Sequence, residues 1–161
     1  MIRIGHGYDL HRIVPERPLI LGGVTIPWDR GLLGHSDADV LLHAITDAVL
    51  GALALGDIGR WFPDTDPKWR GADSAALLRQ VLADPRVQFW RLVNLDATIQ
   101  AERPKLAPHM DAIRQSIAGI FGADVATVSV KAKTMEGTGP IGQGEAIAAH
   151  AVLLLEPAPR A

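Results

Sequence analysis

Two side chains that can bind a metal stand two residues apart near the N-terminus, within the stretch Gly5 to His11. Residues i and i+2 of an extended strand point to the same face, so Asp9 and His11 present a carboxylate oxygen and an imidazole nitrogen side by side. The pair suits zinc, which needs at least one further protein ligand. His43, on a predicted helix that begins near Asp37, is the best candidate. Three ligands leave one tetrahedral position open, as in catalytic zinc sites.

The spacing of Asp9 and His11 also permits a simpler interpretation, in which both side chains are exposed to solvent at the end of a strand. Gly5 and Gly7 share their face and carry no side chain, so a bulky group can approach the backbone there. Asp47 follows His43 by one helical turn. It is either a hydrogen-bonding partner of that imidazole or a polar residue facing solvent.

Composition indicates one globular domain of ordinary size. The 161 residues are 48% hydrophobic and 21% charged, with a net charge of −2, so the chain can bury a core. No stretch gathers Lys and Arg, and nucleic acid is not an expected partner. No apolar run approaches the ~20 residues that cross a bilayer, and no secretory signal is expected. The lack of cysteine excludes disulfides and fits a cytoplasmic location.

Hydrophobic periodicity and turn residues predict a mixture of strands and helices. Strands are expected over residues 1–11, 19–21, 24–26, 92–100, 128–134 and 146–156. Helices are expected from about 37 until Gly56, over 72–83, and over 108–121. A capping box at Ser36 would begin the first helix. The remaining segments include a flexible connector at 31–35, an irregular segment at 61–67, a glycine-rich loop at 137–144 and a frayed tail at 157–161.

These elements do not alternate strictly, and neither a repeat nor a long linker divides them. We therefore expect one α+β domain over residues 1–161, with a single mixed sheet and helices packed on one face. The predicted strand 92–100 alternates apolar residues with Asn94, Asp96, Thr98 and Gln100. That polar but weakly charged face is compatible with a subunit contact or with solvent.

Seven short blocks keep a recognisable order and spacing from Ile2 to about Leu155. They are Asp9-x-His11, His35-Ser36-Asp37-x-Asp39, His43, Gly56-Asp57-Ile58-Gly59, Phe62-Pro63-Asp64-Thr65-Asp66, Arg103-Pro104-Lys105 and Lys131-Ala132-Lys133-Thr134-x-Glu136. With these blocks the chain resembles the 2-C-methyl-D-erythritol 2,4-cyclodiphosphate synthases of the non-mevalonate isoprenoid pathway. The resemblance favours the metal-site interpretation over simple solvent exposure.

The resemblance implies an enzyme of isoprenoid precursor biosynthesis. Its reaction would be a metal-dependent phosphorus-oxygen lyase step on 4-diphosphocytidyl-2-C-methyl-D-erythritol 2-phosphate, a cytidine diphosphate-linked small molecule. The products would be 2-C-methyl-D-erythritol 2,4-cyclodiphosphate and CMP. The resemblance also implies a homotrimer with three active sites, each between neighbouring subunits.

The site residues implied by the resemblance fall into groups by role. The metal ligands would be Asp9, His11 and His43 for zinc, and Glu136 for magnesium or manganese. The residues that stabilise the transition state would be His35 and Thr134. The phosphate and methylerythritol side would be bound by Asp9, Leu10, His11, His35, Ser36, Asp57, Ile58, Gly59, Phe62, Pro63, Asp64, Thr65 and Asp66. The cytidine side would be bound by Ala101, Glu102, Arg103, Pro104, Lys105, Leu106, Ala107, Lys133, Thr134, Met135 and Glu136.

The chemistry of these residue types agrees with that reaction. A phosphate monoester has a second pKa near ~6, so the attacking 2-phosphate is already an anion and needs no general base. Two divalent cations with hydrogen-bond donors such as His35 and Thr134 would hold the phosphates together. Asp64 and Asp66 can equally stabilise a turn through Asx hydrogen bonds. Lys105 is either a phosphate contact or a solvated loop charge.

The glycine-rich loop departs from the family pattern. The family usually has a Phe and an Arg where this chain has Pro140 and Gln143. Those family residues line a cavity on the trimer axis that can hold an isoprenoid diphosphate. Without the cation and the aromatic wall, we expect this chain to bind an isoprenoid diphosphate weakly there.

Two other functions remain open at this point. A zinc-dependent phosphohydrolase would use the same three ligands, although the cytidine block and Glu136 argue against it. A trimeric ligand-binding scaffold that retains the metal site is the non-enzymatic alternative. The product separates them, because a synthase gives a cyclic diphosphate, a hydrolase an opened phosphate, and a scaffold no turnover.

Overall fold

The computed structural model describes residues 1–159. Its centre is a five-stranded mixed sheet in the order β4-β1-β7-β5-β6. The strands are β1 (Arg3–Pro15), β4 (Arg30–Leu32), β5 (Trp90–Gln100), β6 (Val128–Lys133) and β7 (Ala146–Pro157). Strands β5 and β6 run parallel, and the other neighbours are antiparallel. Strands β2 (Leu19–Leu21) and β3 (Val24–Ile26) form a separate hairpin, so the prediction of a single sheet is wrong in this respect.

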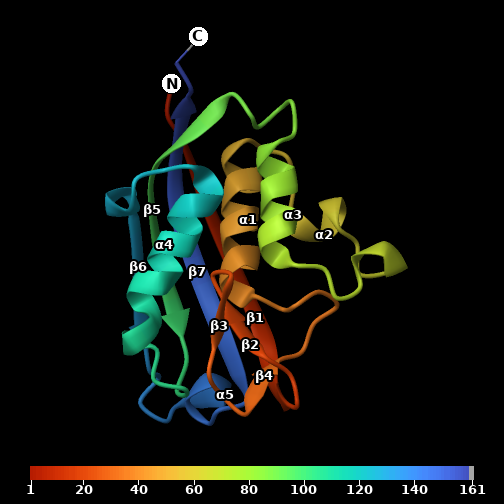
Figure 1. The fold of residues 1–161 in the computed structure, drawn as a ribbon, viewed down its shortest axis with the longest axis vertical. Helices are drawn as coiled ribbons and strands as arrows, with labels where there is room; N and C mark the ends of the chain where they lie inside the picture. Colours follow the sequence, from red (N-terminus) through yellow and green to blue (C-terminus); the bar gives the residue numbers. More distant parts are fainter. Residues whose placement is uncertain (160–161) are drawn as a thin grey trace.

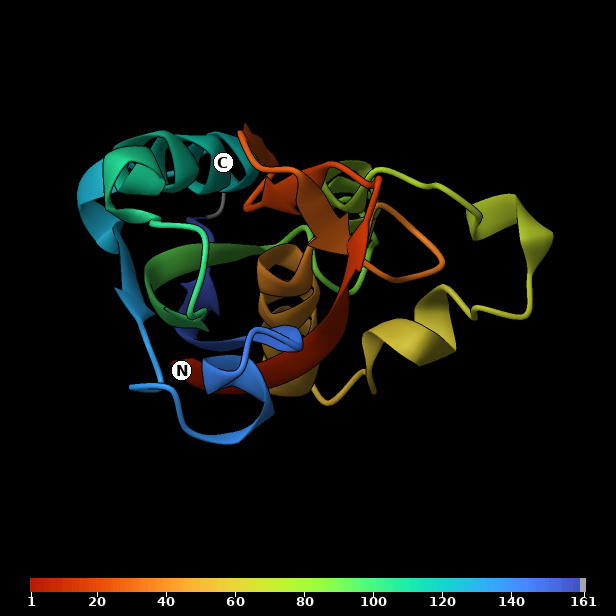
Figure 2. The same ribbon diagram turned by 90° about the horizontal axis from the view of Figure 1, so that it is seen from below.

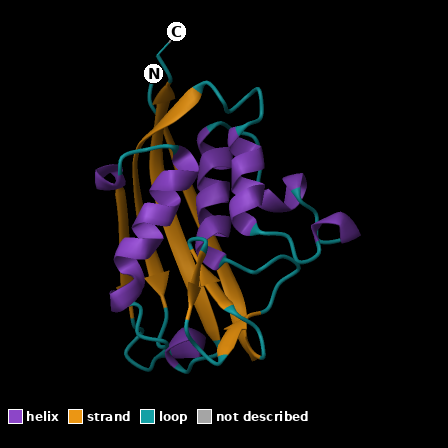
Figure 3. Ribbon diagram, in the orientation of Figure 1, coloured by secondary structure: helices purple, strands orange, loops and turns teal. Residues whose placement is uncertain are grey.

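The main helices lie in front of the sheet in Figure 1. The helices are α1 (Val40–Ala52), α2 (Ile58–Trp61), α3 (Ser74–Leu82), α4 (Met110–Phe121) and α5 (Gly139–Gly142), with short 3-10 turns at Pro67–Trp69, Ala107–His109 and Val125–Thr127. Figure 3 shows the strands behind α1, α3 and α4, with α2 to one side and α5 near the lower end of the sheet. The predicted α+β class with a mixed sheet is confirmed.

The core lies between these helices and the sheet. Fully buried apolar side chains on the helix side include Leu41, Ile45, Leu78 and Ile113, and they pack above Ile99 of β5. Removing such side chains from water is the main stabilising term for a domain of this size. Within residues 1–159, none of the helices has the length and apolar character needed to cross a membrane.

Helix α1 packs directly on the backbone of β1. A Cβ placed on Gly7 would lie 1.8 Å from the carbonyl oxygen of Ala44, and one on Gly5 would lie 1.8 Å from that of Ala48. No side chain fits in such a space, so both positions require glycine. The bulky group expected beside these glycines is therefore a helix of the same chain. Its close approach brings His43 to Asp9 and His11 of β1.

Asp39 ties the N-terminus of α1 to the β2–β3 turn. The residue is fully buried, and its carboxylate accepts the backbone N–H groups of Gly22 (2.9 Å), Gly23 (2.7 Å) and Leu42 (3.0 Å). Burial raises the pKa of Asp39 to about 6. Because Asp39 is the N-cap, the predicted cap at Ser36 is wrong and α1 begins a turn later than predicted.

The first strand extends beyond its predicted end at His11. Residues Arg30–Leu32 form β4 and pair with Ile13–Pro15, at the end of β1. The expected flexible connector at 31–35 is therefore partly a strand. A proline is tolerated where a strand ends at the sheet edge, because no ladder hydrogen bond requires its missing N–H.

Other boundaries also shift by a few residues. Pro157 pairs with Trp90 and belongs to β7, so the predicted tail at 157–161 begins later, and its last residues, 160–161, lie outside the described part of the chain. A bulge between Leu92 and Asn94 breaks the predicted alternation of β5. Short helices occupy part of two predicted loops. Helix α2 ends at Trp61, the first residue of the segment 61–67, and α5 lies within 137–144.

The face of the sheet away from α1 carries exposed apolar side chains. Ile4 is 69% exposed, Tyr8 47%, Leu10 44% and Val152 39%. The even-numbered residues of β1 alternate with the glycines that contact α1, so these side chains point away from the helices. The Tyr8 ring packs against His150 in a tilted arrangement, with centroids 4.7 Å apart.

Candidate active site

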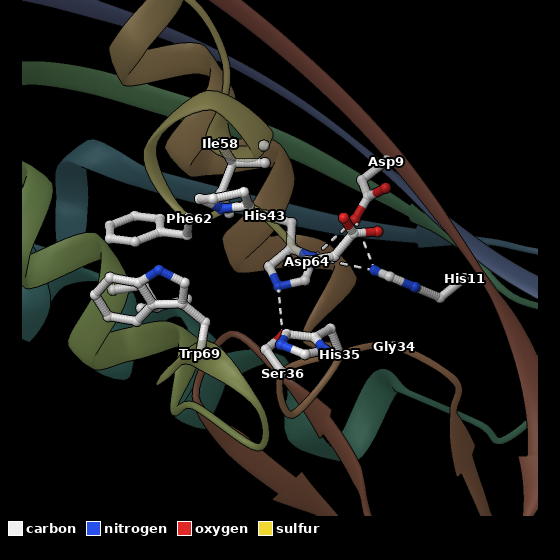
Figure 4. A pocket seen from close by; sticks show the side chains of 13 residues that line it. Asp9, His11, Gly34, His35, Ser36, His43, Ile58, Phe62, Asp64 and Trp69 are labelled. Atoms are coloured by element: carbon white, nitrogen blue, oxygen red, sulfur yellow. Dashed lines mark hydrogen bonds and ion pairs between the residues drawn. The ribbon is translucent and has the colours of Figure 1, made fainter. Parts of the chain in front are cut away.

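A cavity of about 440 Å³ opens beside β1, α1 and α2, and its side chains are drawn in Figure 4. It is lined by Asp9, His11, Gly34, His35, Ser36, His43, Ile58, Gly59, Phe62, Pro63, Asp64, Trp69 and Leu77. All but Gly34, Trp69 and Leu77 were expected at the site. Neither Trp69 nor Leu77 belongs to a motif, so only the fold reveals that they line it.

Three potential metal ligands converge at this cavity. Oδ2 of Asp9 lies 2.9 Å from Nε2 of His11 and 3.0 Å from Nδ1 of His43, and the two nitrogens are 3.0 Å apart. Ligands of tetrahedral zinc at about 2.0–2.1 Å would lie roughly 3.3 Å from one another. A small outward movement of these atoms would therefore accommodate the ion. The donor set and its geometry fit a divalent metal.

The backbone of Leu33 fixes the orientation of His11. Nδ1 of His11 lies 2.8 Å from the Leu33 carbonyl oxygen. A carbonyl oxygen can only accept, so Nδ1 carries the hydrogen and donates it. In the neutral ring Nε2 then keeps its lone pair, which points toward Asp9 and His43.

Charge interactions among the three residues shift two pKa values. Burial opposes ionisation of Asp9, but its close contacts with His11 and His43 outweigh this effect and hold the pKa of this carboxyl well below its usual range. Burial also favours neutral His11, yet the hydrogen bond and charge of Asp9 raise the pKa of this imidazole above its ordinary value. The cluster thus keeps a carboxylate available for a cation over a wide pH range.

On its other side, the His43 ring contacts two serines. Nε2 of His43 lies 3.0 Å from Oγ of Ser74 and 3.1 Å from Oγ of Ser36.

Both interpretations of Asp47 are wrong, because its carboxylate accepts the backbone N–H of Ile58 at 2.7 Å. Asp47 thereby holds the start of α2 against α1, at the edge of the cavity.

The segment that carries His35 and Ser36 is anchored from several sides. Arg17 donates to the Gly34 carbonyl at 3.0 Å and to the Ser36 carbonyl at 2.9 Å. Nε2 of His35 donates to the Asp66 carbonyl at 3.1 Å. The His35 imidazole is therefore held by a main-chain acceptor and the backbone around it by Arg17, a positioning residue that the motifs did not indicate.

A second cavity, of about 430 Å³, lies at the ends of β5 and β6. Its lining is Ala101, Glu102, Arg103, Pro104, Lys105, Leu106, Ala107, Ala132, Lys133 and Thr134. Met135 and Glu136 follow directly but do not line it. The Glu102 carboxylate accepts the Met135 N–H at 3.1 Å, and the Thr134 hydroxyl donates to Glu136 at 2.7 Å. These contacts hold the 133–136 segment beside the cavity.

The two cavities lie far apart within one chain. Asp9 pairs with Ala149, Ala149 with Ile99, and Ile99 with Ala132, which lines the second cavity. Three strand spacings of 4.7–4.9 Å separate the ends of this row by about 14 Å. In Figure 2, α2, which contributes to the first cavity, lies at one side of the molecule and β6, which contributes to the second, lies at the other. His35 and Thr134, both expected at the transition state, therefore face different cavities of the same chain.

Four further predicted substrate residues do not line the first cavity. The side chain of Leu10 lies on the opposite face of the sheet, and Thr65 lines a neighbouring cavity. Asp57 is the N-cap of α2, where its carboxylate accepts the Arg60 N–H. Asp66 accepts the Lys68 N–H, the Asx turn considered from the sequence.

Comparison with known proteins identifies relatives along almost the whole chain. Over 156 residues it is 62% identical to the 2-C-methyl-D-erythritol 2,4-cyclodiphosphate synthase of Trichlorobacter lovleyi, covering 97% of this chain and 99% of that protein. A solved structure of a 2C-methyl-D-erythritol-2,4-cyclodiphosphate synthase in a CDP-bound form matches with a TM-score of 0.87 and 40% identity, covering 96% of this chain and 100% of that one.

A longer protein also contains this fold. The structure of the bifunctional IspDF from Campylobacter jejuni matches with a TM-score of 0.92 and 41% identity, covering 98% of this chain but 42% of that one. The YgbB family matches residues 2–156. The resemblance drawn from the sequence motifs is thereby confirmed, and the chain belongs to the YgbB family.

Proposed function

We propose that this protein converts 4-diphosphocytidyl-2-C-methyl-D-erythritol 2-phosphate to 2-C-methyl-D-erythritol 2,4-cyclodiphosphate and releases CMP. The observation that carries the proposal is the convergence of Asp9, His11 and His43 at a cavity that also presents His35 and Ser36. A relative with 62% identity bears the name of this synthase. A metal site beside imidazole and hydroxyl groups suits a reaction between two phosphates.

The first cavity would hold the reacting phosphates. Zinc bound by Asp9, His11 and His43 would supply positive charge to a phosphate oxygen as charge develops. His35, held by the Asp66 carbonyl, would orient and stabilise the phosphate by hydrogen bonding. The Ser36 hydroxyl would add a further donor. The 2-phosphate, already an anion, attacks the β-phosphorus in line, and the bond to the CMP oxygen breaks.

The second cavity would bind the cytidine end of the substrate. Its lining at 101–107 and the adjoining segment 133–136 are the parts of the chain that the family resemblance assigns to the cytidine. Glu136 is exposed and would hold magnesium or manganese against the diphosphate. The Thr134 hydroxyl donates a hydrogen bond to Glu136 at 2.7 Å in this structure. With substrate bound, it would donate to a phosphate oxygen instead. The CDP-bound form of a relative supports a cytidine diphosphate-linked substrate.

A homotrimer would unite the two cavities. The diphosphate of one substrate would have to contact both His35 and Thr134. Within one chain it cannot reach both, because their cavities lie about 14 Å apart across the sheet. Rotating one copy of the chain against another would place the metal cavity of one subunit beside the cytidine cavity of the next. The uncovered sheet face, with exposed Ile4, Tyr8 and Leu10, suits the contact around the threefold axis.

Two further expectations accompany the trimer. Pro140 and Gln143 are exposed in and beside α5. The weak binding of an isoprenoid diphosphate on the axis stays a prediction. Calorimetric titration with geranyl diphosphate checks it, and micromolar binding at one site per trimer would contradict it. A cytoplasmic location also stays a prediction, supported by the lack of cysteine.

Phosphorus NMR of the purified protein with its diphosphocytidyl substrate tests the reaction. We expect a cyclic diphosphate and CMP in equal amounts, dependent on divalent metal. An opened phosphate would indicate a hydrolase, and no turnover in the metal-loaded protein would indicate a binding scaffold. Either of these results would refute the proposed function.

A further inference from the structure

A partly buried chain of hydrogen bonds leads away from the Asp9–His11–His43 cluster through His43. Nε2 of His43 lies 3.0 Å from Oγ of Ser74, and that hydroxyl contacts Oδ1 of Asp37 closely. Ser74 is 1% exposed, so water does not compete for these contacts. Ser74 and Asp37 lie outside both cavities, and the proposed function assigns neither of them a role.

The direction of each hydrogen bond follows from the chemistry of Asp37. Its oxygens accept the backbone N–H of Ser74 at 3.0 Å and that of Asp39 at 3.2 Å. A carboxylate has no hydrogen to give, so the Ser74 hydroxyl donates to Asp37. With its only hydrogen committed, Ser74 can offer His43 nothing but a lone pair. Nε2 of His43 must then carry the hydrogen that it shares with Ser74.

We propose that Asp37 and Ser74 are positioning residues that fix the Nε2–H tautomer and the ring orientation of His43, leaving the Nδ1 lone pair for the metal. Nδ1 is the nitrogen that faces Asp9, at 3.0 Å. The arrangement parallels that of His11, whose Nδ1–H is held by the Leu33 carbonyl. The partners of metal-binding histidines commonly act in this way.

The same arrangement frees Ser36 for the substrate. Oγ of Ser36 accepts the Ala38 N–H at 3.2 Å and lies 3.1 Å from Nε2 of His43. If Ser36 donated to Nε2, the His43 hydrogen would sit on Nδ1 and block the metal. Because Nε2 carries the hydrogen instead, the Ser36 hydroxyl can donate into the cavity.

Zinc affinity of the otherwise intact protein is the first test. Metal-free protein would be titrated with zinc against a chromophoric chelator. Ser74→Ala and Asp37→Asn should each weaken zinc binding by about 10- to 100-fold, the usual cost of losing such a partner. In Asp37→Asn, the amide cannot accept from both the hydroxyl and the N–H of Ser74, because one of its two positions is now a donor.

Asp73 provides a matched control at the same helix end. Its carboxylate caps α3 by accepting the Ala75 N–H at 2.8 Å, next to Ser74 but without contact to His43. Asp73→Ala should lower the melting temperature while leaving zinc affinity near wild type. Wild-type zinc affinity in Ser74→Ala, or an equal loss of affinity in Asp73→Ala, would overturn the proposal.

Nitrogen NMR of the zinc-loaded wild type gives a second readout that needs no variant to fold. We expect His43 to show a protonated Nε2 and a metal-bound Nδ1. Coordination through Nε2 would overturn the inference. The inference rests on the proposed metal site, which His43→Ala tests separately. Zinc retained in that variant would refute the site itself, whereas zinc lost there but unaffected in Ser74→Ala would refute only the role of Ser74 and Asp37.

Discussion

The backbone of Gly7 lies directly beneath Ala44, so closely that a Cβ on the glycine would fall 1.8 Å from the alanine carbonyl oxygen. This contact lets α1 approach β1 without an intervening side chain. His43 precedes Ala44 on the same helix and reaches Asp9 only because of that approach. The separation of helix and strand therefore sets the geometry of the cluster formed by Asp9, His11 and His43.

Gly7→Ala should force α1 away from β1 and disturb the arrangement of Asp9, His11 and His43. Overpacking a close contact costs typically about 1–3 kcal/mol, and here the clash is with backbone, which cannot change rotamer. We expect a lower melting temperature together with weaker zinc binding. Gly119→Ala is the control, because Gly119 is exposed on α4 with open space around it. It should stabilise by about 0.5–1 kcal/mol. Zinc affinity unchanged in Gly7→Ala would contradict the account.

His43→Ala should lose most of the bound zinc and nearly all turnover. Only two protein ligands, Asp9 and His11, would remain, fewer than a catalytic zinc site uses. Elemental analysis of the purified variant checks the metal content. A full zinc complement would show that other residues bind the ion.

Glu136→Gln should lose activity while zinc content and melting temperature stay close to wild type. Glu136 is exposed, and its carboxylate contacts only the nearby Thr134 hydroxyl among the side-chain hydrogen bonds of residues 1–159. The change removes a charge that would hold the second metal and removes no buried contact. A large drop in melting temperature would instead indicate a structural role.

Zinc affinity should fall as pH decreases, beginning above pH 6.5. The pKa of His11 is raised above its ordinary value of 6.5 by Asp9, despite burial. A metal ligand must be neutral imidazole, so zinc competes with a proton that His11 holds more tightly than a free histidine would. Asp9 stays ionised throughout this range because its pKa is depressed.

In the metal-free protein, the contribution of His11 to folding stability changes with pH in the opposite direction to zinc affinity. Protonated His11 paired with Asp9 stabilises the fold below about pH 6.5, and that contribution is lost as pH rises through the raised pKa. Chelator competition and denaturant unfolding across pH 5.5–8 would measure the two trends. Zinc affinity independent of pH would contradict this assignment of ligands.

Local patterns predicted much of the fold and the convergence of Asp9 with His11. Alternation identified β5 and β6, the paired glycines predicted the β2–β3 turn, and the spacing of Asp9 and His11 predicted their common face. These features depend on neighbouring residues. Family motifs added His35, Ser36 and the segments 101–107 and 133–136, which the structure places at two cavities.

Contacts between distant segments could not be predicted in the same way. Asp39, rather than Ser36, caps α1 by accepting the Leu42 N–H, and the same carboxylate also binds the β2–β3 turn. Asp47 binds the backbone of Ile58, eleven residues away. The roles of Arg17 and Ser74 likewise depend on loops brought together by the fold, and periodicity carries no information about such contacts.

The central claim is that each active site joins the metal cavity of one subunit to the cytidine cavity of another. His43→Ala damages the first cavity and Glu136→Gln the segment beside the second. Each variant alone should be inactive. If the two are co-expressed, subunits mix, and a site is intact when its metal side comes from one variant and its cytidine side from the other.

Phosphorus NMR of the co-expressed mixture tests this most directly. With equal amounts and random assembly, half of the metal sides and half of the cytidine sides are intact, so about a quarter of the wild-type rate should return. Separately expressed variants, combined without subunit exchange, should form no cyclic diphosphate. If the co-expressed mixture shows mixed assemblies but no recovery of activity, each site lies within one chain and the account is wrong.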